Sequence, residues 1–366
     1  MSVMMIKNGQ VILENAIVKN TSLLIENGRI KHLGKAAASR KAYTIDAKGL
    51  FVSPGFIDSH IHGDPAKVFP HEIRYGTTAI VPAISCGSPE DIAKSVNSIK
   101  RFRKTAALGP SVLGLRLEGP FISKERAGAQ DKRFIRPPSP RELRGIIKRC
   151  EGLLKIMTLA PELEGAGKLI RILRKSGIIA SMGHTDADYD EGLKGIDAGM
   201  THATHLFNGM RRRTHYNEDS AAFACLDDKR AQVEIIADLI HVKAELLRKT
   251  IAMKRRNALI LITDSVRAEA PGRRTGGGVY RLRDGTIAGS CLTMIEAVKN
   301  AVRSCGARLK DAVAFATINP ARLLGVDAFK GSVARGKDAD IVIFDKNFDV
   351  KMTIVRGRIA YRKRGF

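Results

Sequence analysis

The stretch GFIDSHIH, residues 55–62, is a short apolar run that ends in two histidines separated by one residue. Side chains along a β-strand alternate between its two faces, so His60 and His62 would point the same way and could reach one metal ion together. Pairs of this kind also arise by chance. Whether this pair binds a metal ion therefore has to be judged from the rest of the chain.

Seven further apolar runs follow, and each of them also ends in polar residues. They are TTAIVPAIS (77–85), VLGLRLEG (112–119), KIMTLAPE (155–162), IIASMGHT (178–185), MTHATHLFN (200–208), VEIIADLIH (233–241) and LILITDS (259–265). The segments between them have helical spacing, and Ser88-Pro89 is a helix-start signal. Eight alternating units predict an α/β fold, a (β/α)8 TIM barrel, while an open doubly wound sheet with the same local pattern is the alternative.

The two ends of the chain follow a different pattern. Residues 1–53 contain alternating apolar runs broken by Asn27-Gly28, a dipeptide typical of tight hairpins, and residues 329–366 repeat this style. Both ends therefore predict antiparallel strands. We expect them to share one sheet in a small domain, with the barrel spanning residues 54–328.

Six potential metal ligands stand at the carboxyl ends of the predicted strands. They are His60, His62, Glu118, His184, His205 and Asp264. This shared placement favours the barrel, because the active face of such a barrel is built from those ends. Histidine nitrogens together with carboxylate oxygens suit zinc or another first-row divalent ion. Each residue alone has an ordinary alternative, since Glu118 and Asp264 could cap helices and a lone His184 could be a hydrogen-bonded loop residue.

The remaining histidines are expected to have other roles. His202 precedes His205 by three residues, and on a strand the two would face opposite sides. We therefore expect His202 to be packed and His205, which is nearer the strand end, to line the site. His32 and His71 lack this placement and are expected to be structural, and His215 is expected in an exposed loop.

The composition narrows the class of protein. The 366 residues include 62 Lys and Arg against 37 Asp and Glu, a formal net charge of +25 that favours anionic partners. Nucleic acid is the first alternative partner, but it is not expected, because the charge is dispersed, Trp is absent and aromatic residues make up only 5%. Five widely spaced cysteines without a CxxC pair indicate a reducing cytoplasm, and no apolar segment is long enough for a membrane span.

Several motifs together resemble those of one enzyme family. In chain order they are PGFIDSHIHG (54–63), LEGPFIS (117–123), GHTDAD (183–188), THLFNGM (204–210), IADLIHV (236–242), LITDS (261–265), GSCLTM (289–294), TINPARLLG (317–325) and GKDADIVIFD (336–345). The combination resembles the N-acetylglucosamine-6-phosphate deacetylases of the amidohydrolase superfamily over nearly the whole chain. The resemblance implies a metal-binding (β/α)8 barrel with a small β-sandwich domain built from both chain termini.

The resemblance also assigns roles to individual residues. It implies that Glu118, His184 and His205 bind metal and that Asp264 is the catalytic acid/base. The stretch LAPE (159–162) has no lysine, which disfavours the carboxylated-lysine bridge of ureases and dihydroorotases.

The number of metal ions is left open. Many relatives lack one or both histidines of the first-strand pair and hold one ion, whereas this chain keeps His60 and His62. One or two divalent ions are therefore expected, with zinc as the expected metal, and Glu118 would bridge a pair.

Further residues are implied to contact the substrate. By the same resemblance His241 touches the sugar phosphate, Asn208 and the backbone of Gly209 make neighbouring contacts, and Met294 lines the pocket. Plain core packing explains Met294 equally well.

Two expected substrate contacts depart from the family pattern. HYNED (215–219) places Asn217 where relatives commonly carry a phosphate-binding arginine, and AGAQ (127–130) places Gln130 where many carry a histidine. The arginines at 211–213 could replace the phosphate contact through paired hydrogen bonds, or they could form a solvated turn. Gln130 can still donate and accept hydrogen bonds. The exact sugar is therefore left open.

These observations predict a metal-dependent hydrolase that converts N-acetylglucosamine 6-phosphate, or a close amino-sugar phosphate, to the amino-sugar phosphate and acetate. The two departures keep open an amidohydrolase for another N-acyl compound. The charge of +25 keeps open a basic nucleic-acid-binding scaffold on an inactive fold. A homodimer is expected from the resemblance.

Overall fold

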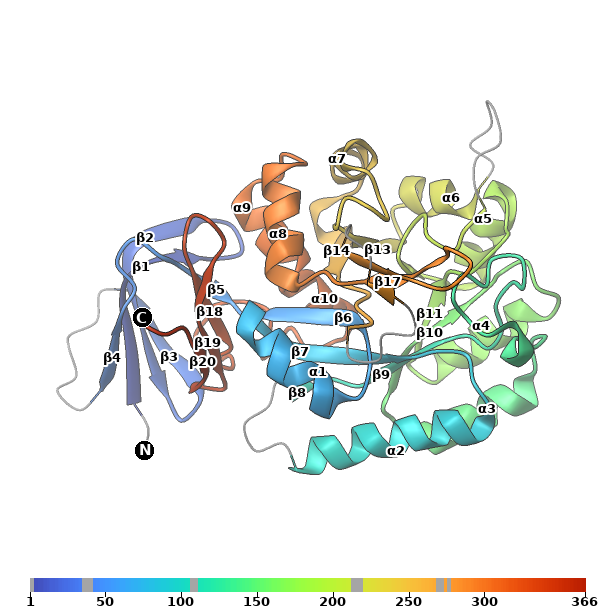
Figure 1. The fold of residues 1–366 in the computed structure, drawn as a ribbon, viewed down its shortest axis with the longest axis horizontal. Coiled ribbons are helices and arrows are strands. Elements are labelled where there is room, and N and C mark those ends of the chain that lie inside the picture. Colours follow the sequence, from blue (N-terminus) through green and yellow to red (C-terminus); the bar gives the residue numbers. More distant parts are fainter. Residues whose placement is uncertain (1–2, 35–41, 106–110, 212–219, 268–272, 275–277) are drawn as a thin grey trace.

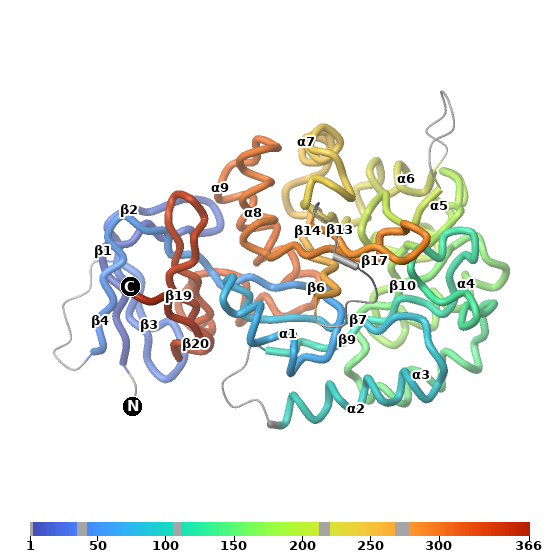
Figure 2. The backbone as a smooth tube through the Cα atoms, viewed as in Figure 1, coloured from blue at the N-terminus to red at the C-terminus, as the bar shows by residue number. Residues whose placement is uncertain are grey.

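The computed structural model describes residues 3–34, 42–105, 111–211, 220–267, 273–274 and 278–366. A sheet made from both ends of the chain stands beside a larger α/β body (Figure 1). The backbone tube shows the red C-terminal segment next to the blue N-terminal strands (Figure 2). No helix within the described ranges is long and apolar enough to cross a membrane.

Eight parallel strands form the barrel and pair in chain order. They are β6 (Phe56–His62), β7 (Thr77–Ile84), β9 (Leu115–Glu118), β10 (Leu154–Leu159), β11 (Ile179–Met182), β12 (His202–Ala203), β13 (Gln232–Ile236) and β14 (Leu259–Ile262), with the short β8 (Ser111–Val112) beside β7. All eight residues of β7 and all four of β14 are buried, as expected for strands covered on both faces.

Backbone hydrogen bonds join the first strand to the end of the last. Asp264 donates its N–H to the carbonyl oxygen of His60 at 2.9 Å, and His62 donates to the carbonyl oxygen of Ser265 at 2.9 Å. These contacts close the barrel at the point where His60, His62 and Asp264 stand. The predicted barrel is therefore confirmed and the open sheet is excluded.

Helices connect the strands around the outside of the barrel. They are α1 (Pro65–Glu72), α2 (Pro89–Thr105), α3 (Pro140–Cys150), α4 (Ala166–Lys175), α5 (Tyr189–Ala198), α6 (Ala221–Asp227), α7 (Ala244–Met253), α8 (Met294–Arg303), α9 (Leu309–Phe315) and α10 (Ile318–Leu323), with 3-10 turns at Ile73–Tyr75, Lys132–Phe134 and Arg256–Ala258. The predicted start of α2 is confirmed, because the Ser88 hydroxyl accepts the backbone N–H of Asp91 at 3.1 Å.

A small antiparallel sheet interrupts the last unit and was not predicted. It consists of β15 (Arg273–Arg274), β16 (Val279–Arg281) and β17 (Ile287–Ser290). Ser290, the last residue of β17, donates its N–H to the carbonyl oxygen of Asp264 at 3.0 Å. This sheet therefore supports the loop that carries Asp264.

The terminal strands form one eight-stranded sheet, which confirms that the two ends of the chain share a sheet. Its strands are β1 (Val3–Ile12), β2 (Ile17–Glu26), β3 (Arg29–Gly34), β4 (Tyr43–Asp46), β5 (Phe51–Pro54), β18 (Ile341–Phe344), β19 (Val350–Val355) and β20 (Arg358–Arg362). The antiparallel pairing of β5 with β18 joins the N-terminal to the C-terminal part. Asn27 and Gly28 have φ of 51° and 78° and form the predicted tight turn between β2 and β3.

This sheet bends around its own hydrophobic core. Ile6 and Leu23 from the N-terminal strands belong to one buried cluster with Ile343 and Met352 from the C-terminal strands. β4 and β5 pair with successive parts of the same strand, β1, so the sheet divides there. The result is the sandwich-like domain that the family resemblance implies.

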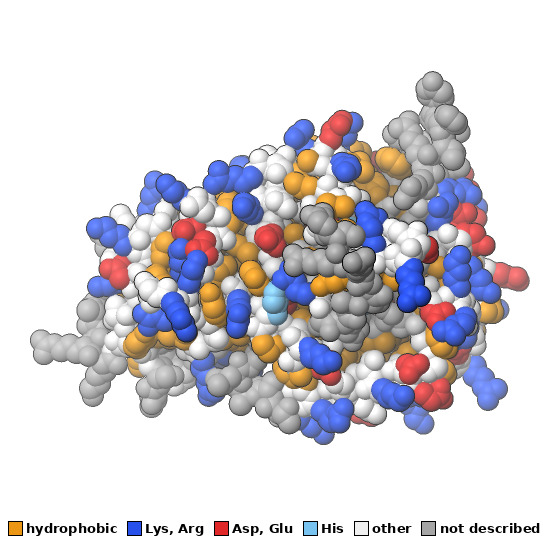
Figure 3. Space-filling model, in the orientation of Figure 1, with side chains coloured by type: hydrophobic (Ala, Val, Ile, Leu, Met, Phe, Trp, Pro, Cys, Tyr) orange, Lys and Arg blue, Asp and Glu red, His pale blue; other side chains and the backbone are white. Residues whose placement is uncertain are grey.

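Positive charge is spread over the surface. Lys and Arg side chains are scattered over the face shown in Figure 3, with Asp and Glu side chains between them. On this face the charge is dispersed, as the sequence indicates.

Candidate metal centre and active site

The structure brings together the six residues that the sequence places at strand ends. His60 and His62 lie on β6, Glu118 ends β9, and His184, His205 and Asp264 follow β11, β12 and β14. They form two groups, each with ligand atoms within 4.8 Å of one another: His60 with His62 and Asp264, and Glu118 with His184 and His205.

Glu118 contacts both groups. Its Oε1 lies 3.2 Å from Nε2 of His60, 3.1 Å from Nε2 of His205 and 3.6 Å from Nε2 of His184. Its Oε2 lies 3.4 Å from Nε2 of His62. One carboxylate therefore stands between the two groups, where it can bridge two ions.

His184 and His205 direct their Nε2 atoms toward each other in an arrangement that suits a bound cation. The Nδ1 of His184 lies 2.8 Å from the carbonyl oxygen of Arg126, and the Nδ1 of His205 lies 3.1 Å from that of Asn208. Because a carbonyl oxygen only accepts, both Nδ1 atoms carry the proton, and in the neutral rings both Nε2 atoms carry a lone pair. These Nε2 atoms are 3.2 Å apart and also face the Glu118 carboxylate. Electron pairs gathered so closely suit a bound divalent ion.

The distances between donor atoms in the second group also suit the binding of one ion. The Oδ1 of Asp264 lies 3.3 Å from Nε2 of His60 and 3.2 Å from Nε2 of His62. Donor atoms bound tetrahedrally at about 2 Å from a zinc-like ion are about 3.3 Å from one another. The buried His60 has a carboxylate oxygen within 3.4 Å of each ring nitrogen, although none of these contacts has ordinary hydrogen-bond geometry. This donor set therefore fits a divalent ion as well.

The carboxylates of the centre are held in their ionised form. Burial alone would raise the pKa of Asp264, but the neighbouring His60 and His62 lower it well below its usual value. Burial likewise opposes ionisation of Glu118, and the surrounding imidazoles, His60 foremost, hold its pKa well below its usual value. Ionised carboxylates are the form that binds metal.

Three of the six residues have a left-handed backbone conformation, which orients their side chains. His184, His205 and Asp264 each stand two residues after the end of their strand and have φ of 48°, 29° and 48°. Such values are uncommon outside glycine and recur at functional sites. The alternation argument for His202 and His205 was therefore incomplete, because β12 ends at Ala203 and a turn, not the strand, orients His205.

Gln130 contacts Glu118 directly. Its Nε2 donates to Oε2 of Glu118 at 2.8 Å, and its Oε1 accepts the backbone N–H of Cys86 at 2.7 Å. Gln130, which was expected to contact substrate, therefore holds the Glu118 carboxylate in place.

Asn208 and Gly209 support the segments that carry His205 and His184. The Asn208 amide donates to the carbonyl oxygens of His205 and Leu206 at 3.2 and 3.3 Å. Gly209 has φ of 58°, and a Cβ at this position would stand 2.9 Å from Nδ1 of His184. This close approach requires glycine there.

His241 does not stand at the end of its strand, where the sequence had predicted it. β13 ends at Ile236, so His241 belongs to the following loop and not to the strand end. Its Nδ1 is 2.6 Å from Oδ2 of Asp238, whose Oδ1 accepts the backbone N–H groups of Ile240 and His241 at 2.9 Å each. Asp238 was not predicted, although an aspartate three residues before a loop histidine is a recognisable signal.

The remaining predicted positions have separate outcomes. Met294 is fully buried in the barrel core at the start of α8, which favours the packing alternative. Asn217, like His215, Arg212 and Arg213, lies outside the described residues. Arg211 is described and lies 3.7 Å from Asp186. His32 is exposed on β3, and His71 on α1 lies 2.8 Å from Glu72.

A layer of buried polar side chains, here called the polar layer, crosses the barrel interior next to the ligands. It consists of Ser59, Arg116, Thr158, Ser181, His202, Thr204 and Glu234, each at most 1% exposed. The expectation that His202 is packed is confirmed. This layer was not predicted. The sequence does contain a signal for it, because the opposite charges Arg116 and Glu234 each stand inside an otherwise apolar strand run.

His202 makes the stability of the fold pH-dependent. Burial lowers its pKa to about 4, against 6.5 for an ordinary histidine. Between these values the unfolded chain binds a proton that the folded chain does not, so stability falls as the pH drops through this window, by up to about 3 kcal/mol. In urea melts from pH 7 to 4.5, H202Q should lose correspondingly less stability than the unsubstituted protein. Equal losses in the two proteins would contradict this account.

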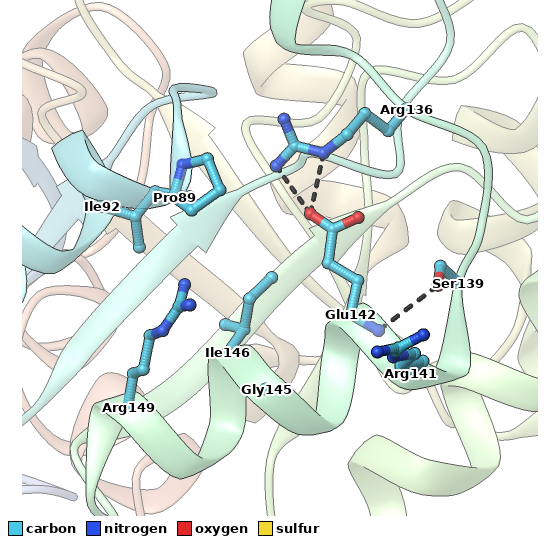
Figure 4. Close-up of a pocket in the computed structure, with 9 residues that line it drawn as sticks. All are labelled: Pro89, Ile92, Arg136, Ser139, Arg141, Glu142, Gly145, Ile146 and Arg149. Atoms are coloured by element: carbon cyan, nitrogen blue, oxygen red, sulfur yellow. Dashed lines mark hydrogen bonds and ion pairs between the residues drawn. The ribbon is translucent and has the colours of Figure 1, made fainter.

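A separate pocket of about 470 Å³ lies outside the barrel between the start of α2 and helix α3. Arg136 and Glu142 form an ion pair at 2.7 Å on its rim, with Arg141 and Arg149 nearby (Figure 4). It contains no predicted site residue, so it is distinct from the metal centre.

Comparison with known proteins agrees with this geometry. The chain matches the amidohydrolase family over residues 51–360. N-acetylglucosamine-6-phosphate deacetylase from Bacillus subtilis (strain 168) is 34% identical over 391 aligned positions, which cover 98% of this chain and 97% of that protein. N-acetylgalactosamine-6-phosphate deacetylase from Escherichia coli O157:H7 is 32% identical, over 84% of this chain and 87% of that protein.

Solved structures show the same similarity. A mutant N-acetyl-D-glucosamine-6-phosphate deacetylase from Mycobacterium smegmatis, in complex with N-acetyl-D-glucosamine-6-phosphate, has a TM-score of 0.89 and 31% identity, and the match covers 98% of this chain and 100% of that chain. The similarity spans both the barrel and the terminal domain. The chain therefore belongs to the N-acetylglucosamine-6-phosphate deacetylase family of amidohydrolases.

Proposed function

We propose that the protein is a metal-dependent deacetylase that converts N-acetylglucosamine 6-phosphate, or a close amino-sugar phosphate, to the amino-sugar phosphate and acetate. The observation that carries the proposal is the facing pair of Nε2 atoms of His184 and His205, 3.2 Å apart beside an ionised Glu118. The names of the relatives support the sugar phosphate, and the inclusion of an N-acetylgalactosamine-6-phosphate deacetylase leaves the choice between these two sugars to experiment.

We infer that zinc is the metal and that two ions bind, one in each group of ligands. Imidazole nitrogens and carboxylate oxygens form a donor set that zinc prefers. A divalent ion held there would polarise the acetamide carbonyl and lower the pKa of water from about 16 toward about 7.

Asp264 is the residue that moves the proton. Its described contacts to His60 and His62 involve Oδ1, which leaves Oδ2 for proton transfer. Its side chain is 15% exposed, whereas His60 beside it is fully buried, so Asp264 is the more accessible of the two. The carboxylate takes a proton from the attacking water and returns it to the departing amine nitrogen, because an unprotonated amine is a poor leaving group.

Two further inferences concern the setting of the enzyme. All five cysteines are free and buried, which supports the cytoplasm as its compartment. The homodimer implied by the resemblance is an expectation that light scattering would test.

Removal of metal should abolish activity, and divalent ions should restore it. Protein stripped with a chelator should release no acetate from N-acetylglucosamine 6-phosphate and should recover after addition of zinc. The control panel contains N-acetylgalactosamine 6-phosphate, both unphosphorylated sugars and other N-acyl compounds. Acetate release from none of the phosphorylated sugars, with any divalent ion, would contradict the proposal.

A further inference from the structure

Glu234 lies on the opposite side of the His60 ring from the metal centre. The Nε2 of His60 faces Oε1 of Glu118 at 3.2 Å and Oδ1 of Asp264 at 3.3 Å, whereas Nδ1 lies 3.4 Å from Oε2 of Glu234. A neutral imidazole has one N–H group and one lone pair. A metal ion in the centre would take the lone pair of Nε2, and Oε2 of Glu234 then stands beside the N–H of Nδ1.

Arg116 fixes the position of this carboxylate. Its Nη1 donates to both oxygens of Glu234, at 2.6 and 2.8 Å, and the Ser59 hydroxyl donates to Oε1 at 2.9 Å. The other end of the guanidinium is tied down as well, because Nη2 donates to Oγ1 of Thr204 at 3.0 Å. Glu234 is thereby immobilised with Oε2 toward His60.

Stability alone is a poor explanation for this buried ion pair. Arg116 and Glu234 are both 0% exposed, and apolar residues of similar volume often replace such pairs without loss of stability. Their position against a ligand histidine suggests another role. A carboxylate that accepts the second N–H of a ligand histidine orients the ring and increases its basicity toward metal.

We propose that Glu234 is a positioning residue for the metal centre, which holds His60 with its proton on Nδ1 and its lone pair toward Glu118 and Asp264, and that Arg116 is the counter-charge that fixes Glu234. This inference rests on the proposed metal-dependent function. Glu234 itself is not a ligand, because the His60 ring separates it from the other donors.

The test measures zinc binding and folding separately. E234Q removes the charge with little change of shape, and the double variant R116M/E234L replaces the whole ion pair with apolar side chains. T250V is the matched control, because it removes an equally buried hydroxyl on α7, whose described bond goes to the carbonyl oxygen of Leu246 at 2.9 Å, away from the polar layer. Zinc affinity is measured by chelator competition, folding by thermal melts, and the His60 Nδ1 proton by NMR of histidine-labelled, zinc-loaded protein.

We expect the zinc dissociation constant to rise about tenfold in E234Q and up to about 100-fold in R116M/E234L, with T250V unchanged. Unchanged affinity in a folded R116M/E234L or E234Q would overturn the positioning role. If neither variant folds, absence of a hydrogen-bonded Nδ1 proton on His60 in the zinc-loaded protein overturns it. A protein that binds no divalent ion before any substitution refutes the proposed function, and the positioning role with it.

Discussion

Replacing Asp264 with asparagine should reduce kcat for deacetylation by about 10³-fold, which is the typical scale for loss of a general acid/base. The amide keeps an oxygen that can face His60 and His62, but it cannot accept the proton of the attacking water. Metal content should therefore change less than kcat. Acetate release and elemental analysis on the same preparation separate the two effects.

The control for this variant is a surface aspartate. The side chain of Asp197 is 67% exposed and pairs with Arg230 at 2.8 Å, so D197N should retain full activity. A D264N protein that keeps both its metal and its rate would show that another group transfers the proton.

Replacing Glu118 with glutamine should empty both halves of the metal centre. Glu118 contacts ligands of both groups, and a neutral amide has neither the charge nor the second acceptor oxygen needed to bridge them. Activity should fall by about 10³-fold or more, because loss of the ion removes the activation of water. Elemental analysis should show reduced metal, whereas the D264N protein should retain more of it.

A glutamate remote from the centre provides the matched control. Glu142 pairs with Arg136 on the outer pocket, and E142Q should keep both metal and rate. A fully metal-loaded E118Q protein would show that the two groups bind ions independently of this carboxylate.

The strand-end positions of the site could be predicted because of one simple relation between sequence and fold. In a parallel barrel all carboxyl ends meet at one mouth, so polar residues that follow apolar runs converge even when they are far apart in the chain. His60 and Asp264 are separated by about 200 residues, yet their side chains are 3.3 Å apart. The same relation favoured the barrel over an open sheet, whereas the shared terminal sheet was predicted from the alternating apolar runs at both ends of the chain.

Side-chain direction could not be predicted in the same way. His184, His205 and Asp264 have positive φ values, and although His and Asp adopt them more often than most residues do, such values stay too uncommon to be placed from sequence alone. Gln130 illustrates the same limit, because its bonds to Glu118 and Cys86 join three separate loops or strands. The opposite charges of Arg116 and Glu234 were visible in the sequence, but their pairing depends on the barrel's curvature.

The pairing of β5 with β18 also constrains how the chain is made. Phe51 and Phe344 are direct partners, so nearly 300 residues must leave the ribosome before β5 gains that neighbour. Until then the N-terminal strands expose an open edge and unfilled apolar positions, which are sites of association between nascent chains. Synthesis of β18, and not of the catalytic portion, is thus the event that completes the N-terminal sheet.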